Sequence, residues 1–230
     1  MTTLGLIGSG NIGGTVARLA VAAGLDVVVS NSRGPETLTG LVSELGDHAR
    51  AGTTDEAARD GDIVVVSVPL KAYRQLPVEP LAGKVVLETL NYYPTRDGQF
   101  PELDAGDATS SELVQRHLAG AKVVKVFNNI FFGHLLNYAR PSGSTERGAL
   151  PIAGDDAAAK ETAAQLLDAL GWDAVDVGSL ADSWRFEPGT PAYGAPYMAD
   201  PGVGFEGLAT DPGTVAPAEK VRGAVAAARR

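Results

Sequence analysis

A run of glycines near the amino terminus has the residue types and the spacing that bind a phosphate group. It reads Gly8-Ser9-Gly10-Asn11-Ile12-Gly13, with glycine at the first, third and sixth positions. In this pattern the first glycine allows a tight turn, the second lets a pyrophosphate approach the backbone, and the third lets a helix pack closely on a strand. The free N–H groups at the start of that helix attract negative charge. The run therefore predicts a pyrophosphate site.

The flanking residues supply the strand and the helix that this motif requires. An apolar run at 4–7 leads into the glycines, and Val16, Leu19 and Ala20 follow them with helical spacing. A second strand is predicted at 26–30, at the right distance for a βαβ unit. These neighbours favour a dinucleotide-binding loop over an ordinary glycine-rich turn.

The end of the second strand indicates which dinucleotide is bound. A protein that binds NAD usually has Asp or Glu here, because a carboxylate accepts hydrogen bonds from the ribose 2′-OH. This chain has Asn31, Ser32 and Arg33, whose amide, hydroxyl and guanidinium groups suit a 2′-phosphate. We therefore predict NADP in preference to NAD, the alternative for Arg33 being an ordinary solvated loop arginine.

Three more predicted strands, at 62–68, 84–87 and 122–126, end in polar or aromatic residues. Because ligands of open α/β sheets bind at the carboxyl ends of the strands, we expect these residues to share one rim. For the cofactor they are Ser67, Val68, Pro69, Leu70 and Asn91, and for the second reactant they are Asn128, Phe131, Phe132 and His134. The alternative for His134 is a surface histidine.

The rest of the chain continues the alternation of strands and helices. Further helices are predicted at 35–45, 54–59, 111–118, 157–170 and 218–229, and further strands at 48–51, 150–153 and 174–177. The pattern is typical of an α/β fold with a Rossmann-type, doubly wound and mostly parallel sheet. We predict this domain for residues 1–178. Residues 179–230 then form an extension, rich in Pro and Gly from 188 to 217, that covers the site or a subunit interface.

The composition argues against several other classes of protein. The chain has no cysteine, which removes disulfides and thiolate chemistry, and no histidine-rich cluster that predicts a metal site. A net charge of −9 argues against nucleic acid as a partner. No apolar run is long enough to span a bilayer, and no signal peptide is recognisable, so we expect a cytoplasmic protein. Its partners would be a small molecule or coenzyme and a second copy of the chain.

No residue is assigned as catalytic from the sequence. Tyr92, Tyr93 and His134 are the rim side chains that could donate a proton, and none is a convincing acid. Lys125 lies within a predicted strand, where we expect it to face solvent or to cap the sheet. Hydride transfer between two ring systems needs positioning and exclusion of water more than it needs an acid.

These motifs together resemble the NADP reductases that use the 8-hydroxy-5-deazaflavin coenzyme F420. The resemblance rests on the glycine motif and on Ser32-Arg33, Ser67-Val68-Pro69, Ser111-Glu112, residues 124–128 and Gly154-Asp155-Asp156. It implies that Ser32 and Arg33 hold the 2′-phosphate of NADP, and that Pro69 and Leu70 line the path to the nicotinamide. It also implies that the reaction passes a hydride between NADP(H) and F420.

Two features depart from that family, and both concern the hydride acceptor. Phe131 and Phe132 stand where the reductases tend to have a small Pro-Ala type of turn, and the Pro/Gly-rich extension replaces a short helical ending. Two alternatives therefore stay open. One is an NADPH-dependent reductase of an imine, a carbonyl or a metal complex, and the other is a non-catalytic module that senses NADP.

Overall fold

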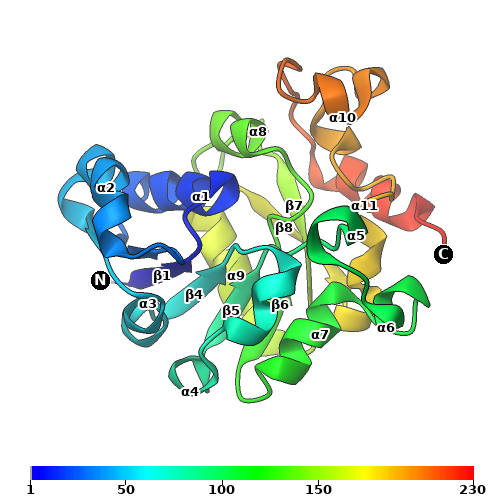
Figure 1. The fold of residues 1–230 in the computed structure, drawn as a ribbon. Coiled ribbons are helices and arrows are strands. Elements are labelled where there is room, and N and C mark those ends of the chain that lie inside the picture. The colour runs from blue at the N-terminus through cyan, green and yellow to red at the C-terminus, as the bar shows by residue number, and fades with distance from the viewer. Residues whose placement is uncertain (1) are drawn as a thin grey trace.

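Eight strands form one sheet in the order β3-β2-β1-β4-β5-β6-β7-β8 (Figure 1). A computed structural model describes residues 2–230, the side chains of residues 205 and 206 excepted. Every neighbouring pair of strands is parallel except β6 and β7, so the predicted Rossmann-type sheet is confirmed with one antiparallel pairing. The strands are β1 (Thr3–Ile7), β2 (Asp26–Ser30), β3 (Ala49–Ala51), β4 (Ile63–Val66), β5 (Val85–Glu88), β6 (Lys122–Lys125), β7 (Ala149–Gly154) and β8 (Asp173–Gly178).

The helices cover both faces of the sheet and its carboxyl edge (Figure 1). The α-helices are α1 (Asn11–Ala22), α2 (Thr39–Leu45), α3 (Thr54–Asp60), α4 (Val78–Leu81), α5 (Pro94–Asp97), α6 (Pro101–Asp104), α7 (Ser110–His117), α8 (Phe132–Asn137), α9 (Ala157–Ala169), α10 (Gly204–Gly207) and α11 (Ala218–Ala227). The 3-10 helices are η1 (Pro35–Leu38), η2 (Gly46–His48), η3 (Leu70–Gln75), η4 (Leu180–Phe186), η5 (Ala195–Tyr197) and η6 (Pro201–Val203). Within residues 2–230, no helix combines the length and the apolarity needed to cross a bilayer.

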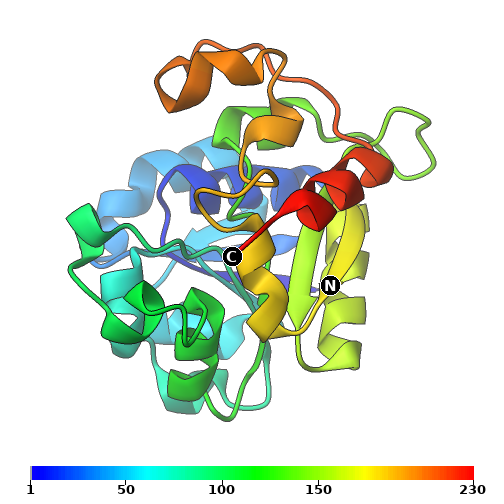
Figure 2. The ribbon, with the colours of Figure 1, turned by 90° about the vertical axis from the view of Figure 1, so that its right-hand side faces the viewer.

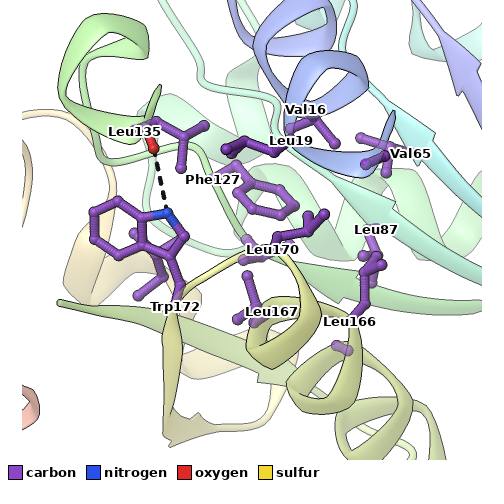
Figure 3. Close-up of a cluster of buried hydrophobic side chains, with 14 of the residues drawn as sticks. Val16, Leu19, Val65, Leu87, Phe127, Leu135, Leu166, Leu167, Leu170 and Trp172 are labelled. Carbon is purple, nitrogen blue, oxygen red and sulfur yellow. Dashed lines mark hydrogen bonds between the residues drawn. The ribbon is translucent and has the colours of Figure 1, made fainter. Parts of the chain in front are cut away.

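The central strands β1 and β4 are almost entirely apolar because both faces of the sheet are buried there. Leu6 and Val65 belong to a core cluster with α1, α2 and α9, whereas Val64 and Val86 belong to a second cluster with α3 and α7. Figure 3 shows the first cluster. Its labelled members are Val16, Leu19, Val65, Leu87, Phe127, Leu135, Leu166, Leu167, Leu170 and Trp172.

Phe127 turns the chain sharply just after β6. Among residues 2–230 it is the one non-glycine residue with a left-handed backbone, at φ 63°. Such a conformation costs about 1–2 kcal/mol. The Phe127 ring is completely buried in the first cluster, and burying a side chain of this size contributes roughly 1.5–3 kcal/mol (Figure 3). Core packing therefore offsets the strain, and the turn directs the following residues to the carboxyl edge.

The segment after β8 packs into the same core as the sheet. Tyr197 is completely buried, donates a hydrogen bond to the carbonyl of Ala149 (2.9 Å) and lies edge-on to Trp172. The backbone N–H of Ala149 donates to the carbonyl of Ala216 (2.8 Å), and α11 packs on β7 and β8. Figure 2 shows the extension in orange and red, running over the top of the molecule and back along these strands.

Lys125 corrects a prediction, because it neither faces solvent nor caps the sheet. Its strand is internal and covered on both faces, so the side chain is completely buried. The ammonium group donates to Oε1 of Glu88 (3.0 Å), to the carbonyl of Leu90 (2.7 Å) and to Oγ of Ser110 (3.0 Å). The carboxylate of Glu187 lies 3.5 Å away. This network joins β5, β6 and α7 to the carboxyl-terminal segment.

We predict that the buried network is essential for stability. Lys125→Met keeps most of the apolar part of the side chain but leaves the carboxylate of Glu88 buried without its cation, which should lower the free energy of unfolding by about 3–5 kcal/mol. Lys122→Met is the control in the same strand, because Lys122 is half-exposed and forms a surface ion pair with Asp156. This variant should lower the free energy of unfolding by about 1 kcal/mol or less. Urea unfolding measures both variants, and equal losses would contradict the prediction.

Candidate functional site

The glycine loop joins β1 to α1 at the carboxyl edge of the sheet. Gly8 has a φ of +102°, and a Cβ atom on Gly13 would lie only 1.9 Å from the carbonyl oxygen of Gly8. The fold itself therefore requires glycine at both positions. Gly10 differs, because its φ is −74° and no atom lies within 4 Å of where its Cβ would be. The space in front of Gly10 is open to a ligand.

Helix α1 begins at this open space without a capping group. Among the described residues, no side chain bonds to its first N–H groups, and its first turn contains no acidic residue. The unpaired N–H groups and the positive end of the helix dipole both favour an anion at this position.

Two cavities meet at the glycine loop. The main cavity has a volume of about 590 Å³ and the second cavity about 560 Å³, and both are lined by Gly10, Asn11 and Phe132. Besides these residues, the main cavity is lined by Ile12, Ser67, Val68, Pro69, Thr89, Asn91, Tyr93, Arg96, Asn128, Asn129, Ile130, Phe131, Tyr193, Gly194, Ala195, Met198, Pro201, Gly204 and Leu208. The second is lined by Ser9, Gly14, Thr15, Arg18, Arg33, Thr37, Leu38, Leu41, Glu44, Gly133 and Leu136.

Arg33 lines the second cavity and makes no ion pair with any other side chain that the structure describes. Asn31 shapes the turn that carries it, since Oδ1 of Asn31 accepts from the N–H of Arg33 (2.8 Å) and Nδ2 donates to Oγ1 of Thr37 (2.9 Å). Ser32 is exposed in the same turn and lines neither of the two cavities. The guanidinium of Arg33 is thus available to an anion.

A second arginine, Arg18, also lines this cavity, and the sequence interpretation did not include it in the site. Arg18 forms a two-point ion pair with Glu44, at 2.6 and 2.8 Å, and the hydrogen bond from Arg18 holds the pKa of the Glu44 carboxyl below its usual range. The charge of Glu44 is therefore compensated and does not oppose an anion near Arg33. The sequence contains a pattern that could have identified Arg18. It follows Asn11 by seven residues and therefore lies on the same face of α1.

The main cavity brings together most of the residues predicted at the rim. Asn91 and Asn128 join the ends of β5 and β6, because Nδ2 of Asn91 donates to the carbonyl of Asn128 (2.7 Å) and Nδ2 of Asn128 donates to Oδ1 of Asn91 (3.1 Å). Phe131 and Phe132 are half-buried, with ring centroids 4.3 Å apart. A flat ring system can pack against such a wall.

A pair of tyrosine hydroxyls also lies on the wall of the main cavity. Tyr93 and Tyr193 share a hydrogen bond, and the guanidinium of Arg96 lies 4.8 Å from the centroid of the Tyr93 ring. Burial, together with the bond to Tyr93, raises the pKa of the Tyr193 hydroxyl well above its usual value. The sequence interpretation missed Tyr193, and no local signal marks it, because only the packing of the extension brings it beside Tyr93.

Two residues predicted for the site lie elsewhere. Leu70 starts η3 and is completely buried in the second core cluster, beneath the turn that places Pro69 in the main cavity. His134 is neither in the cavity nor on the surface. It faces inward from α8, is 2% exposed, and its Nε2 donates to the carbonyl of Asp211 (3.0 Å), so it binds the extension.

Tyr92 also points away from the main cavity, although it is adjacent to Tyr93 in sequence. Its hydroxyl donates to Oδ1 of Asp104 (2.7 Å) and accepts from the N–H of Phe100 (3.1 Å). Of the three weak acid candidates from the sequence, only Tyr93 lines the cavity.

Comparison with known proteins places the chain among NADP-dependent oxidoreductases. The structure is similar to protein SMa0349 of Sinorhizobium meliloti, with a TM-score of 0.73 and 31% identity, covering 85% of this chain and 94% of that one. It is also similar to an Arthrobacter sp. FB24 protein assigned as an F420-dependent NADP reductase, with a TM-score of 0.67 and 25% identity, covering 80% and 87% of the two chains.

Among curated sequences, metalloreductase STEAP3 of Rattus norvegicus is 29% identical over 186 residues, which are 80% of this chain. The chain spans 35% of the length of STEAP3. Residues 3–92, which include the glycine loop and Arg33, match the family described as NADP oxidoreductase, coenzyme F420-dependent. The chain belongs to this family of F420-dependent NADP oxidoreductases.

Proposed function

We propose that this protein transfers a hydride between NADP(H) and the deazaflavin coenzyme F420. The observation that carries the proposal is the meeting of two cavities at the glycine loop, one with an unpaired arginine and the other with an aromatic wall. A dinucleotide whose pyrophosphate lies at the loop would have its adenosine end toward the second cavity and its nicotinamide end toward the main cavity.

The residues present fit NADP. The uncapped start of α1 and the open space at Gly10 would receive the pyrophosphate. Arg33, with Ser32 beside it, would bind the 2′-phosphate. The turn at 67–69 and Asn91 would border the nicotinamide, while Leu70 would only support that turn from the core.

The main cavity fits a planar acceptor beside the nicotinamide. Phe131 and Phe132 would pack against its ring, and Asn128 would offer polar contact at the rim. Bound NADPH supplies the hydride, and the protein orients the two rings and keeps water out. The family match supports F420 as that acceptor.

A smaller imine or carbonyl compound is the second candidate acceptor. The hydroxyls of Tyr93 and Tyr193 in the main cavity favour it, because reduction of such a bond needs a proton for its nitrogen or oxygen. The homodimer and the cytoplasmic location expected from the sequence stay predictions.

Turnover of F420 tests the proposed function directly. Purified protein should reduce F420 with NADPH, seen as loss of the oxidised deazaflavin absorbance, and should oxidise reduced F420 with NADP. If neither direction proceeds, F420 is not the acceptor, and the same NADPH assay with imines and aldehydes then tests the second candidate.

One prediction concerns recognition of the 2′-phosphate of NADP. Arg33→Ala should weaken NADPH binding about tenfold to a hundredfold, because a charge-assisted contact contributes roughly 1.5–3 kcal/mol, and should leave the weaker NADH binding unchanged. Arg50→Ala is the matched control, since Arg50 lies on β3 in an ion pair with Asp60. Calorimetric titration of both nucleotides measures the effect. Equal affinities of the unaltered protein for NADPH and NADH would defeat the assignment.

A second prediction separates the glycines of the loop. Gly10→Val should abolish NADPH binding but lower the free energy of unfolding by only about 1 kcal/mol, because its backbone angle suits any residue and the space is open. Gly13→Ala should instead destabilise the fold by about 3 kcal/mol or more, since its Cβ meets a backbone oxygen. Unfolding curves and NADPH titrations distinguish the two variants. If Gly10→Val still binds NADPH, the pyrophosphate does not bind at the glycine loop.

A further inference from the structure

A proton donor would assist the proposed hydride transfer. An acceptor that gains a hydride at carbon moves an electron pair onto its nitrogen or oxygen, and a proton delivered to that atom neutralises the charge that develops there. NADPH supplies only the hydride. A hydroxyl or another acid that reaches the main cavity therefore has a defined role, whether the acceptor is a deazaflavin, an imine or a carbonyl.

Few polar groups near the main cavity could donate this proton. The ammonium of Lys125 is fully buried and bonded to Glu88, Leu90 and Ser110. His134 and Tyr92 make their bonds outside the cavity, as described above. Arginine does not give up its proton in proteins, which excludes Arg96 as the donor. The hydroxyls of Tyr93 and Tyr193 remain as the candidate proton donors.

We propose that the Tyr93 hydroxyl donates this proton to the acceptor, and that Tyr193 positions Tyr93 and stabilises the phenolate that results. The inference rests on the proposed function in one respect, namely that the hydride acceptor occupies the main cavity.

The environment of the pair assigns the two roles. Burial and the bond to Tyr93 raise the pKa of the Tyr193 hydroxyl, so Tyr193 stays protonated and can donate to the Tyr93 oxygen. In that arrangement Tyr93 keeps its own hydrogen for the acceptor. Once Tyr93 has lost that hydrogen, the phenolate still receives the bond from Tyr193, and the guanidinium of Arg96 lies over its ring.

The extension holds Tyr193 in place through bonds on both sides of it. Nδ2 of Asn129 donates to the carbonyl of Ala192 (2.8 Å), and the N–H of Gly194 donates to the carbonyl of Asn129 (2.9 Å). Gly194 has a φ of 77°, which lets the chain turn back after Tyr193. Residues 192–194 are thus bound to the loop after β6, and the extension contributes directly to the site.

The acceptor gains a C–H bond from the hydride, and an electron pair moves to nitrogen or oxygen, from the C=N or C=O bond of an imine or carbonyl or through the conjugated C=C–C=N system of a deazaflavin. That atom forms an N–H or O–H bond with the proton of Tyr93 as the O–H bond of Tyr93 breaks. Tyr93 is left as a phenolate and regains a proton from solvent.

The test compares Tyr93→Phe and Tyr193→Phe with Tyr92→Phe, the adjacent tyrosine outside the cavity. With F420 and NADPH, Tyr93→Phe should lose about a hundredfold or more in kcat and Tyr92→Phe should change little. Tyr193→Phe should lose less, about tenfold, and should move the alkaline limb of the pH–rate profile to higher pH, because the phenolate loses its donor. Thermal unfolding and NADPH affinity of all three should match the unaltered protein.

A second readout needs neither turnover nor cofactor. The anion 4-nitrophenolate, whose absorption band shifts when its oxygen accepts a hydrogen bond, is titrated into the protein alone. We expect binding with a shifted band, weakened about tenfold to a hundredfold in Tyr93→Phe and unchanged in Tyr92→Phe.

The outcomes separate the inference from the proposed function. Full F420 turnover by Tyr93→Phe would overturn the inference and keep the proposed function. Absence of turnover in the unaltered protein would defeat F420 as acceptor, and the phenolate titration would then decide on Tyr93. Absence of phenolate binding, or equal binding to Tyr93→Phe, would overturn the inference in that case.

Discussion

The buried ammonium of Lys125 is the constraint on which the carboxyl edge depends. An unpaired charge in the interior is strongly destabilising. Folding therefore favours the arrangement in which the Lys125 ammonium group has all of its hydrogen-bond partners. Lys125 lies opposite Glu88 in the register of β6 and β5 and also bonds to Leu90. Asn91 follows directly, and Asn128 is three residues beyond Lys125. The ion pair thereby fixes the two strand ends that carry these asparagines to the main cavity.

The same network attaches the carboxyl-terminal extension to the sheet. Glu187 accepts a hydrogen bond from Ser110 (2.7 Å) beside Lys125, and the chain then continues into the segment that lines the main cavity with Tyr193 and Met198. Reacting carbons must come within about 3–3.5 Å for hydride transfer, so rigid walls matter more than strong contacts. A site closed by a segment that is itself part of the core meets that demand.

The phosphate half and the acceptor half of the proposed site are built in different ways. The phosphate half is local, because the glycine loop and Arg33 lie within a single βαβ unit and need only that unit to be formed. The acceptor half is assembled from the loops after β4, β5 and β6 together with the extension. Its shape also depends on the left-handed turn at Phe127, which is stable because the first core cluster buries the ring (Figure 3).

The sequence by itself determined the strands, the α-helices of seven residues or more and the proposed phosphate half, because hydrophobic period and glycine spacing are local properties. Tertiary structure alone decided the antiparallel direction of β7, the burial of Lys125 and His134, and the meeting of Tyr93 with Tyr193. The alternation of side chains every two residues is the same in a parallel and an antiparallel strand, so the sequence pattern does not reveal the direction of β7. Whether a lysine or a histidine is exposed depends on partners such as Glu88 and Asp211, which lie far away in the chain and become neighbours only when the sheet and the extension pack together.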